Sequence, residues 1–277
     1  MPELPEVERV RRRLAPALVG ARFARVRLNR ADLRRPFPPG FATGLRGQTV
    51  LALTRRGKYL VAELSSGDTL IMHLGMSGSF RVEPRRRRAR RDPDEALEHR
   101  HDHVIFEMSS GVTVTFNDPR RFGAMDLVAA DDVHGVRKLG PEPLSPEFDA
   151  ASLAERCAKR RTSLKVALLD QRVVAGLGNI YASEALHLAR LSPLRFARTI
   201  ATGTGRPRPA TGRLVTAIKR VLERAIRLKS TDNYSRSGRF RVYDREGERC
   251  PTPGCRGTIR RISQTGRSTF YCPDCQG

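Results

Sequence analysis

The sequence of 277 residues lacks any long hydrophobic run, and its first residues contain no apolar segment of the kind found in signal peptides. It becomes charged at once, with Glu3, Glu6 and Glu8 followed by the arginines within residues 9–13. A membrane-spanning helix, a secretory signal and a basic amphipathic anchor are therefore not expected. We expect a protein that stays in the cytoplasm or on the nucleoid, with no membrane partner.

Acidic residues are few relative to basic ones, since 29 Asp and Glu stand against 52 Lys and Arg, which gives a formal net charge of +23. Only six of the basic residues are lysine, so a GC-rich coding bias can account for part of the arginine excess. A compact fold with this charge repels itself unless a polyanion belongs to its working state. Nucleic acid is therefore the expected partner, although charge alone does not say what is done to it.

Short strands dominate the first half of the chain and helices the second. Residues 47–83 and 103–116 alternate apolar segments with turn residues, which is typical of β-hairpins. An N-terminal helix is expected with Pro5 in its first turn. Helical periodicity follows at about residues 151–172, 181–189 and 212–229, and the tail from residue 242 is strand-like.

We therefore expect an α+β multidomain chain. Residues 1–133 would form a β-rich domain, residues 134–149 a linker rich in Pro and Gly, residues 150–241 a helical domain and residues 242–277 a small terminal module. Residues 85–91, which are mostly arginine, show no periodicity and are interpreted as a basic loop.

Four of the five cysteines lie in the last 28 residues. Cys250 and Cys255 are separated by four residues, Cys272 and Cys275 by two, and sixteen residues separate the pairs. Two thiolate pairs on facing turns can close a tetrahedral zinc site, and four protein ligands would make that zinc structural. The alternative is a pair of turns without metal. Cys157 lies in a helical stretch and is expected to be a buried, small apolar residue.

Two weaker patterns suit a nucleic acid. Residues 260–270 contain two strand-like pieces around Thr265 and Gly266, which places Arg267 near a hairpin tip, although a solvated turn arginine is the simpler interpretation. Gly176 and Gly178 indicate a tight turn before a helix that starts near Asn179. Backbone N–H groups at such a helix N-terminus can hold a phosphate, but a turn of this kind is more often only a connection.

Three histidines, His99, His101 and His103, occupy alternate positions at the entry to a strand. They could bind a metal from one face, yet no carboxylate partner is apparent. Contact of one or two of them with phosphate is the favoured interpretation.

Several motifs together resemble one family. In chain order they are MPELPEVE, RRGKYL, HLGMSGS, HDHV, DPRRFG, GLGNIYASE and the cysteine-rich tail with TGRSTFYCPDC. This order is similar to that of the bacterial formamidopyrimidine-DNA glycosylases, the MutM-type relatives of endonuclease VIII, and it covers nearly the whole chain. The resemblance implies a β-sandwich flanked by helices, a helix–two-turn–helix domain and a zinc-binding β-hairpin.

The same resemblance implies the activity. A DNA glycosylase and AP lyase of base excision repair would excise formamidopyrimidines and 8-oxoguanine from duplex DNA, also accept abasic sites, and cleave the strand by β,δ-elimination. The sequence carries no oligomeric signal, and a monomer suits a protein that scans duplex DNA. Removal of Met1 would free the nitrogen of Pro2 to form a Schiff-base intermediate with C1′ of the damaged nucleotide. Glu3 would act as the general acid, and Lys58 would contact a phosphate beside the lesion.

The remaining site residues carried over from the resemblance contact DNA. Asn179 and Arg267 would bind the flanking phosphates, and His101 and Lys165 would make further backbone contacts. Three residues would fill the space that an extruded nucleotide leaves: Met76, Arg120 and Phe122. Taken alone, Met76 and Phe122 would be interpreted as core residues.

The lesion preference stays open because residues 229–240 form a shorter segment than the loop that covers an extruded 8-oxoguanine in the family. A preference for oxidised pyrimidines or further-oxidised guanine, as in endonuclease VIII, is therefore an alternative. The basic insertion at residues 85–91 also exceeds the family pattern. An alternative of another class is a zinc-stabilised DNA-binding protein without catalysis, against which Pro2, Glu3 and Lys58 all argue.

Overall fold

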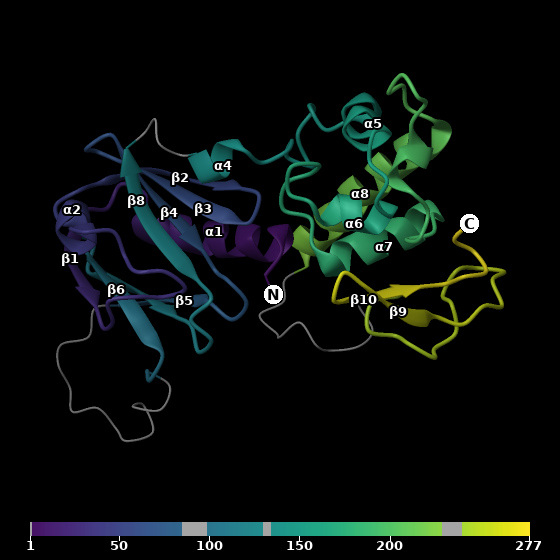
Figure 1. The fold of residues 1–277 in the computed structure, drawn as a ribbon. Coiled ribbons are helices and arrows are strands. Elements are labelled where there is room, and N and C mark those ends of the chain that lie inside the picture. Colours follow the sequence, from purple (N-terminus) through teal and green to yellow (C-terminus); the bar gives the residue numbers. More distant parts are fainter. Residues whose placement is uncertain (1, 85–98, 130–133, 229–239) are drawn as a thin grey trace. The chain divides into compact units, whose positions relative to one another are not determined.

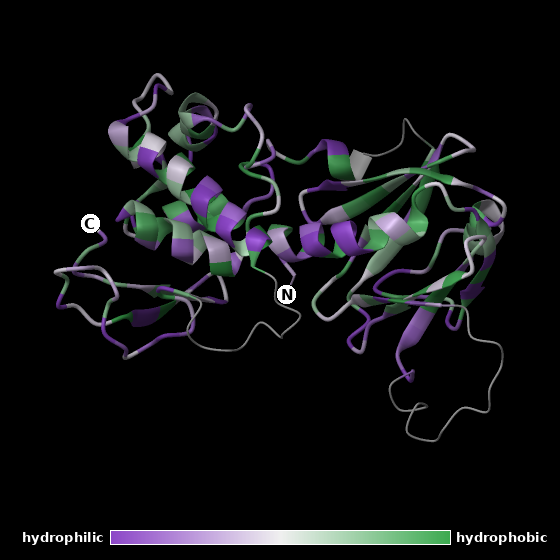
Figure 2. Cartoon of the chain, turned by 180° about the vertical axis from the view of Figure 1, so that it is seen from behind, coloured by the Kyte–Doolittle hydropathy of each residue, from purple (hydrophilic) through white to green (hydrophobic). Residues whose placement is uncertain are grey.

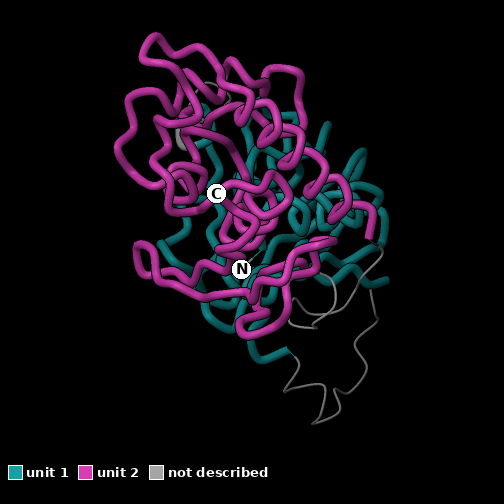
Figure 3. The backbone as a smooth tube through the Cα atoms, turned by 90° about the vertical axis from the view of Figure 1, so that its right-hand side faces the viewer, with its two compact units in different colours: residues 1–137 teal, residues 138–277 magenta. Residues whose placement is uncertain are grey.

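The computed structural model describes residues 2–84, 99–129, 134–228 and 240–277 (Figure 1). The basic insertion at 85–91 and residues 229–239 of the short segment lie outside the described residues. The chain divides into two compact units, residues 1–137 and 138–277, shown separately coloured in Figure 3.

Unit 1 is built on two four-stranded antiparallel sheets. The first has the order β2-β3-β4-β8, with β2 at Val50–Arg56, β3 at Tyr59–Leu64, β4 at Asp68–His73 and β8 at Ala124–Ala129. The second has the order β1-β6-β7-β5, with β1 at Phe23–Leu28, β6 at Asp102–Met108, β7 at Val112–Asn117 and β5 at Ser79–Pro84. Two short helices, α2 (Phe41–Leu45) and α4 (His134–Arg137), complete the unit.

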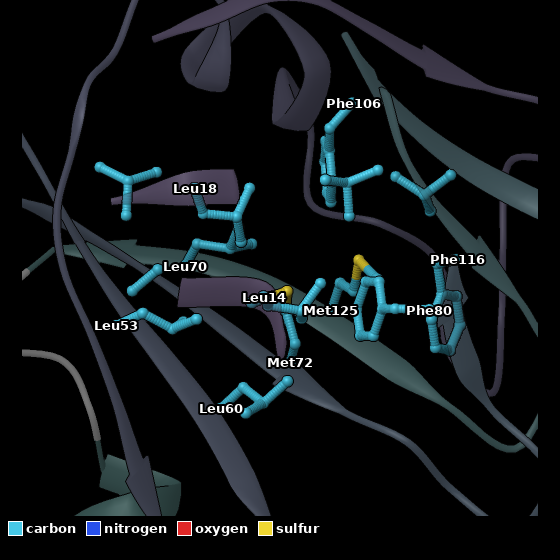
Figure 4. Close-up of a cluster of buried hydrophobic side chains, with 14 of the residues drawn as sticks. Leu14, Leu18, Leu53, Leu60, Leu70, Met72, Phe80, Phe106, Phe116 and Met125 are labelled. Carbon is cyan, nitrogen blue, oxygen red and sulfur yellow. The ribbon is translucent and has the colours of Figure 1, made fainter. Parts of the chain in front are cut away.

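The first helix, α1 (Leu4–Leu18), contacts strands of both sheets. Pro5 lies in its first turn, as the sequence predicts, and Leu14 and Leu18 are buried. Figure 2 shows hydrophilic residues along the N-terminal half of this helix and apolar ones beyond them. Figure 4 shows the shared core, in which the two leucines belong to one cluster with side chains from both sheets, among them Met72 and Phe116. One core between two sheets is the predicted β-sandwich.

Unit 2 is mainly helical and ends in a hairpin. Its helices are α5 (Ala150–Ala158), α6 (Leu164–Leu169), α7 (Asn179–Ala189) and α8 (Pro209–Arg227), with a 3-10 turn, η1, at Ala197–Ile200. Strands β9 (Arg260–Gln264) and β10 (Arg267–Tyr271) form the hairpin. Helix α7 packs against α8 and also against β10, so the hairpin is fixed to the helical part of the unit.

One helix differs from the prediction. The periodicity between residues 151 and 172 predicts a single helix, but α5 ends at Ala158 and α6 begins at Leu164. Ser163 precedes α6 in an extended conformation, and it bridges to Phe196 instead of continuing α5. Among the described residues, no helix combines the length and the apolar character needed to cross a membrane.

Candidate functional site

Pro2 and Glu3 lead directly into α1. Glu3 is the N-cap residue and is almost fully buried, and its reciprocal capping box with Glu6 includes a 3.0 Å hydrogen bond from the Glu3 backbone N–H to Glu6 Oε2. This arrangement satisfies backbone donors at the start of the helix and fixes the residue that follows Pro2. The positive end of the helix dipole lies at this terminus, where it disfavours a further positive charge.

Lys58 lies in the two-residue turn between β2 and β3, where Gly57 has a φ of +58°. The guanidinium of Arg55 donates to the Gly57 carbonyl at 3.0 Å and lies 3.5 Å from the carboxylate of Glu8 on α1. Burial alone would raise the pKa of Glu8, but hydrogen bonds from arginines of α1 lower it below its ordinary value. A charged Glu8 thus ties the Lys58 turn to the helix that begins beside Pro2.

His73, at the end of β4, lies in the field of Lys58. Burial, together with the nearby charges of Lys58 and Arg34, lowers its pKa to about 4. Its Nδ1 atom accepts the Gly75 backbone N–H at 3.0 Å, and its ring lies 4.8 Å from that of Tyr59. The ring is therefore neutral at physiological pH, and the positive charge here comes from the lysine and the arginine.

The three residues predicted to fill a DNA gap come together on two adjoining loops. Met76 and Phe122 are 40% and 39% exposed, and the Arg120 guanidinium lies 4.9 Å from the Phe122 ring centre. The loops touch through their backbones at Gly75, whose φ is +61°. A Cβ there would lie 2.2 Å from the Phe122 carbonyl carbon, so only glycine allows this approach.

The Asp118 side chain links the two loops through hydrogen bonds. Its carboxylate is fully buried and accepts Ser77 Oγ at 2.5 Å and the Gly123 backbone N–H at 2.7 Å. Its carbonyl lies 2.9 Å from His103 Nε2. The Asp118 carboxylate thus fixes both loops, because it binds Ser77, the residue after Met76, and Gly123, the residue after Phe122.

The three histidines at the start of β6 do not gather into a metal site. His99 Nδ1 lies 2.7 Å from Asp102 Oδ2, which also accepts the Arg81 guanidinium at 2.6 Å, whereas His103 is buried against the Asp118 carbonyl. His101 is half-buried, and its ring centre lies 6.4 Å from that of His103. Within the described parts of the chain, the four cysteines are the only group of three or more His, Cys, Asp and Glu with metal-binding geometry.

The cysteines of the tail fit a zinc ion. The Sγ atoms of Cys250 and Cys275 are 3.7 Å apart, those of Cys255 and Cys272 are 3.6 Å apart, and all four lie within 4.8 Å of one another. A tetrahedral zinc with sulfur ligands at about 2.3 Å needs sulfur atoms about 3.8 Å apart. The chain thus carries one structural zinc site. Cys157 is buried as predicted, and burial raises the pKa of its thiol to about 11.

Helix α7 connects this zinc module to the Asn179 turn. The buried carboxylate of Glu184 accepts three successive backbone N–H groups, those of Arg241, Val242 and Tyr243, at 2.8, 2.8 and 2.9 Å. One turn later, His187 Nε2 lies 3.5 Å from Cys250 Sγ and 3.2 Å from Thr252 Oγ1. These contacts anchor the start of the zinc module and its first cysteine on the same helix.

The turn before Asn179 is shaped by Gln171. Its Oε1 atom accepts the Gly176 N–H at 2.8 Å, and its Nε2 atom donates to the Leu177 carbonyl at 2.9 Å. Gly176 has a φ of +79°, and Asn179 is the first residue of α7. The Asn179 amide therefore stands at a helix N-terminus, where backbone N–H groups and the dipole favour an anion.

Arg267 is exposed and begins β10 directly after the Thr265–Gly266 turn, as the sequence predicts. Lys165 differs from its expected place, because its side chain is fully buried in α6 rather than presented at a DNA-binding surface. Its ammonium donates to Asn179 Oδ1 and Thr269 Oγ1, both at 2.6 Å, and to the Ser268 carbonyl at 3.1 Å.

Sequence reasoning did not single out several residues that shape these sites: His73, Asp118, Gln171, Glu184 and His187. Three of them stand inside the motifs HLGMSGS, DPRRFG and GLGNIYASE. The signal that could have identified these three is that each is a titratable residue in a motif from which another residue had already been assigned to the site. Their partners are distant in sequence, as with Asp118 and Ser77, and the fold alone reveals them.

Comparison with known families covers most of the chain. Residues 1–125 match the formamidopyrimidine-DNA glycosylase N-terminal domain, residues 139–236 match the H2TH domain of the same enzymes, and residues 247–277 match the zinc finger found in FPG and IleRS.

Full-length relatives agree with the family models. The chain is 55% identical to the formamidopyrimidine-DNA glycosylase of Rhodopseudomonas palustris strain HaA2, with complete coverage of both chains. The MutM (FPG) protein of Thermus thermophilus has a TM-score of 0.80 at 37% identity, covering 100% of this chain and 99% of the other. A Lactococcus lactis FPG mutant in complex with Fapy-dG-containing DNA has a TM-score of 0.82 at 31% identity and covers 99% of both chains.

Proposed function

Because the chain belongs to the formamidopyrimidine-DNA glycosylase family, and so is a DNA glycosylase of DNA repair, we propose that it excises formamidopyrimidines and 8-oxoguanine and then cleaves the strand. The observation that carries this proposal is the position of Pro2 beside the buried N-cap carboxyl of Glu3. The Fapy-dG-containing DNA bound by the Lactococcus lactis relative supports the substrate class.

The nucleophile would be the nitrogen of Pro2 after removal of Met1. Attack requires the neutral amine, and the positive end of α1 beside it disfavours protonation. As the nitrogen bonds to C1′ and loses its N–H proton, the glycosidic bond breaks and its electron pair leaves with the base. The base takes up one proton, which balances the proton that the nitrogen loses. A covalent intermediate replaces one difficult displacement by two easier steps.

Glu3 would supply the proton that the sugar needs when its ring opens. The C1′–O4′ bond breaks, O4′ accepts the proton, and the C1′ carbon becomes the carbon of an iminium with Pro2. That iminium nitrogen has no hydrogen to lose, so the charge persists and acidifies the C2′ proton. Loss of this proton expels the 3′ phosphate, a second elimination expels the 5′ phosphate, and water releases the enzyme.

Residues of both units would hold the DNA. Lys58, Asn179 and Arg267 would contact phosphates near the lesion, with His101 as a further contact. Met76 and Phe122 would enter the gap that the extruded nucleotide leaves, and Arg120 would face the unpaired base. Extrusion costs a few kcal/mol, and inserted apolar side chains offset part of it. Their exposure on loops that Asp118 and Gly75 hold together supports this role.

The zinc would act through structure alone, because all four of its ligand positions are cysteines of the chain. It would stiffen the module whose hairpin presents Arg267, and it would not contact the reacting sugar.

Borohydride trapping tests the proposal. Purified protein is incubated with abasic-site duplex and borohydride, which reduces the iminium to a stable covalent complex. Protein with a processed N-terminus should be trapped, and protein that retains an N-terminal tag should not. Glu3→Gln should slow base excision strongly, whereas Glu223→Gln, at an exposed position of α8, should leave it unchanged. Absence of trapping with a processed terminus would contradict the Pro2 Schiff base and the strand cleavage that depends on it.

Lesion preference is a separate part of the proposal. Residues 229–240 form a short segment, which favours efficient handling of formamidopyrimidines or oxidised pyrimidines over 8-oxoguanine. Single-turnover excision from duplexes with formamidopyrimidine, 8-oxoguanine and thymine glycol would rank the three. Fastest excision of thymine glycol would assign the preference of endonuclease VIII.

A further inference from the structure

Lys165 is a fully buried cation within unit 2. A buried ammonium is costly unless its donors are satisfied, and here all three N–H groups have acceptors within α7 and β10. The neighbouring residues of α6, Leu164, Ala167 and Leu168, are buried and apolar. The side chain is thus directed at polar atoms of the phosphate-binding elements rather than at solvent.

The first consequence concerns the amide of Asn179. Lys165 Nζ donates to Asn179 Oδ1 at 2.6 Å, while Asn179 Nδ2 donates to the Ser268 carbonyl at 2.9 Å. A flipped amide would set its NH₂ group against the ammonium and its oxygen against a carbonyl. The lysine therefore fixes one orientation of the amide, in which the nitrogen faces away from it and keeps a second hydrogen to donate.

The second consequence concerns the hairpin. Ser268 and Thr269 directly follow Arg267 on β10, and both are held by Lys165. Thr269 Oγ1 also donates to Gln264 Oε1 at 2.8 Å, and Gln264 is the residue opposite Arg267 in the hairpin. Gln264 Nε2 in turn donates to Ser163 Oγ at 3.0 Å, at the start of α6. The network thus closes back on the helix that carries the lysine.

We propose that Lys165 is a positioning residue for phosphate binding, which acts through Asn179 and does not itself contact DNA. It holds the Asn179 amide in the donating orientation. It also fixes the position of that amide relative to β10, the strand that begins at Arg267. This inference rests on the proposed function, in which Asn179 and Arg267 bind phosphates of the damaged strand.

A double-mutant cycle tests it on full-length, zinc-loaded protein. The probe is a fluorescein-labelled duplex with one tetrahydrofuran abasic-site analogue, and the measurement is the equilibrium Kd by anisotropy. Asn179→Ala and Lys165→Met should each weaken binding about tenfold, the effect of losing about one charged hydrogen bond. Because both changes disable the same contact, the double variant should bind within about twofold of Asn179→Ala.

The control is Lys219→Met, since Lys219 is also a helical lysine of unit 2 and donates to a backbone carbonyl, that of Ser145, at 3.1 Å. Its Kd should stay within about twofold of the wild type. Zinc content and the midpoint of thermal unfolding confirm that each variant is folded, and Lys165→Gln replaces Lys165→Met in the cycle if the latter is not.

Two outcomes overturn separate statements. If the two losses multiply, to about a hundredfold in the double variant, Lys165 contributes independently of Asn179 and the positioning role is wrong. If Asn179→Ala binds the probe as tightly as the wild type, the phosphate contact assigned to Asn179 under the proposed function fails instead.

Discussion

Replacement of Asp118 by alanine tests how the two exposed loops are held. The carboxylate accepts hydrogen bonds from Ser77 Oγ and from the Gly123 backbone N–H at a position with no exposure. Alanine removes both acceptors and leaves the Gly123 N–H buried without this partner. Charge-assisted hydrogen bonds contribute about 1.5–3 kcal/mol each, so we expect the free energy of unfolding to fall by about 4 kcal/mol.

Asp118→Asn should cost much less, because an amide keeps one oxygen for the Gly123 N–H and can donate its NH₂ group to Ser77 Oγ. We expect a loss of about 1 kcal/mol for this variant. Asp126→Ala is the matched control, since Asp126 is an exposed aspartate on β8 of the same unit. Urea denaturation at pH 7 would measure all three.

The rate of base excision should depend on how firmly these two loops are held. Met76 and Phe122 can offset the cost of extruding a nucleotide only if their loops hold them in place, and each 1.4 kcal/mol lost in the transition state is about tenfold in rate. Single-turnover excision from a duplex should therefore fall at least about tenfold in Asp118→Ala. Borohydride trapping on single-stranded abasic DNA, which leaves no gap to fill, should stay near the wild-type level.

The opposite pattern would refute this reasoning. If folded Asp118→Ala excised a lesion from duplex as fast as the wild type, the two loops would not depend on the carboxylate for their function. Equal losses on duplex and on single-stranded DNA would show that the variant is damaged generally.

Four further outcomes are expected. Cys272→Ser should lose zinc and DNA affinity together, measured by metal analysis and anisotropy, because the ion holds the module that presents Arg267. Affinity for duplex should fall about a thousandfold between 50 and 200 mM salt if about six phosphates are neutralised, and a flat titration would contradict a DNA-facing charge. Stability should decline as the pH falls from 6.5 to 4, because His73 has a pKa of about 4 in the folded protein and about 6.5 in the unfolded chain, which therefore binds the proton first. His73→Gln should remove about 3 kcal/mol of that decline, as measured by urea titrations at each pH. Glu184→Gln should lower the free energy of unfolding by about 3 kcal/mol, since an amide cannot accept all three backbone N–H groups, and a melting temperature equal to that of the wild type would show that the carboxylate is dispensable.

Local patterns predicted the zinc site and the hairpin well. The four cysteines need only two short turns to face one another, and Arg267 follows a turn whose Thr265 and Gly266 both have positive φ values. The first helix was equally accessible, because Pro5 and its apolar spacing lie within one short stretch. Family resemblance extended these local signals to a β-sandwich and a helical domain, and both the family models and the structural relatives confirm that fold.

Long-range contacts were beyond the sequence. Lys165 is a residue type that usually lies at the surface, and only the arrival of β10, about a hundred residues later, supplies acceptors that allow its burial. Asp118 and Ser77 are 41 residues apart in the chain. The break between α5 and α6 has the same origin, because Ser163 pairs with Phe196 instead of continuing a helix whose periodicity runs on.

Helix α7 gives the enzyme a vulnerability remote from its chemistry. Asn179 opens the helix, and His187, eight residues on, touches the sulfur of Cys250, a separation of about 12 Å along the axis. Peroxide or a mercurial that attacks the thiolates would thus loosen one end of this helix, whose other end carries the amide that, under the proposed function, contacts a DNA phosphate. Such an agent would weaken DNA binding while the Pro2 amine stayed chemically intact. The treated enzyme should therefore still react with a small aldehyde.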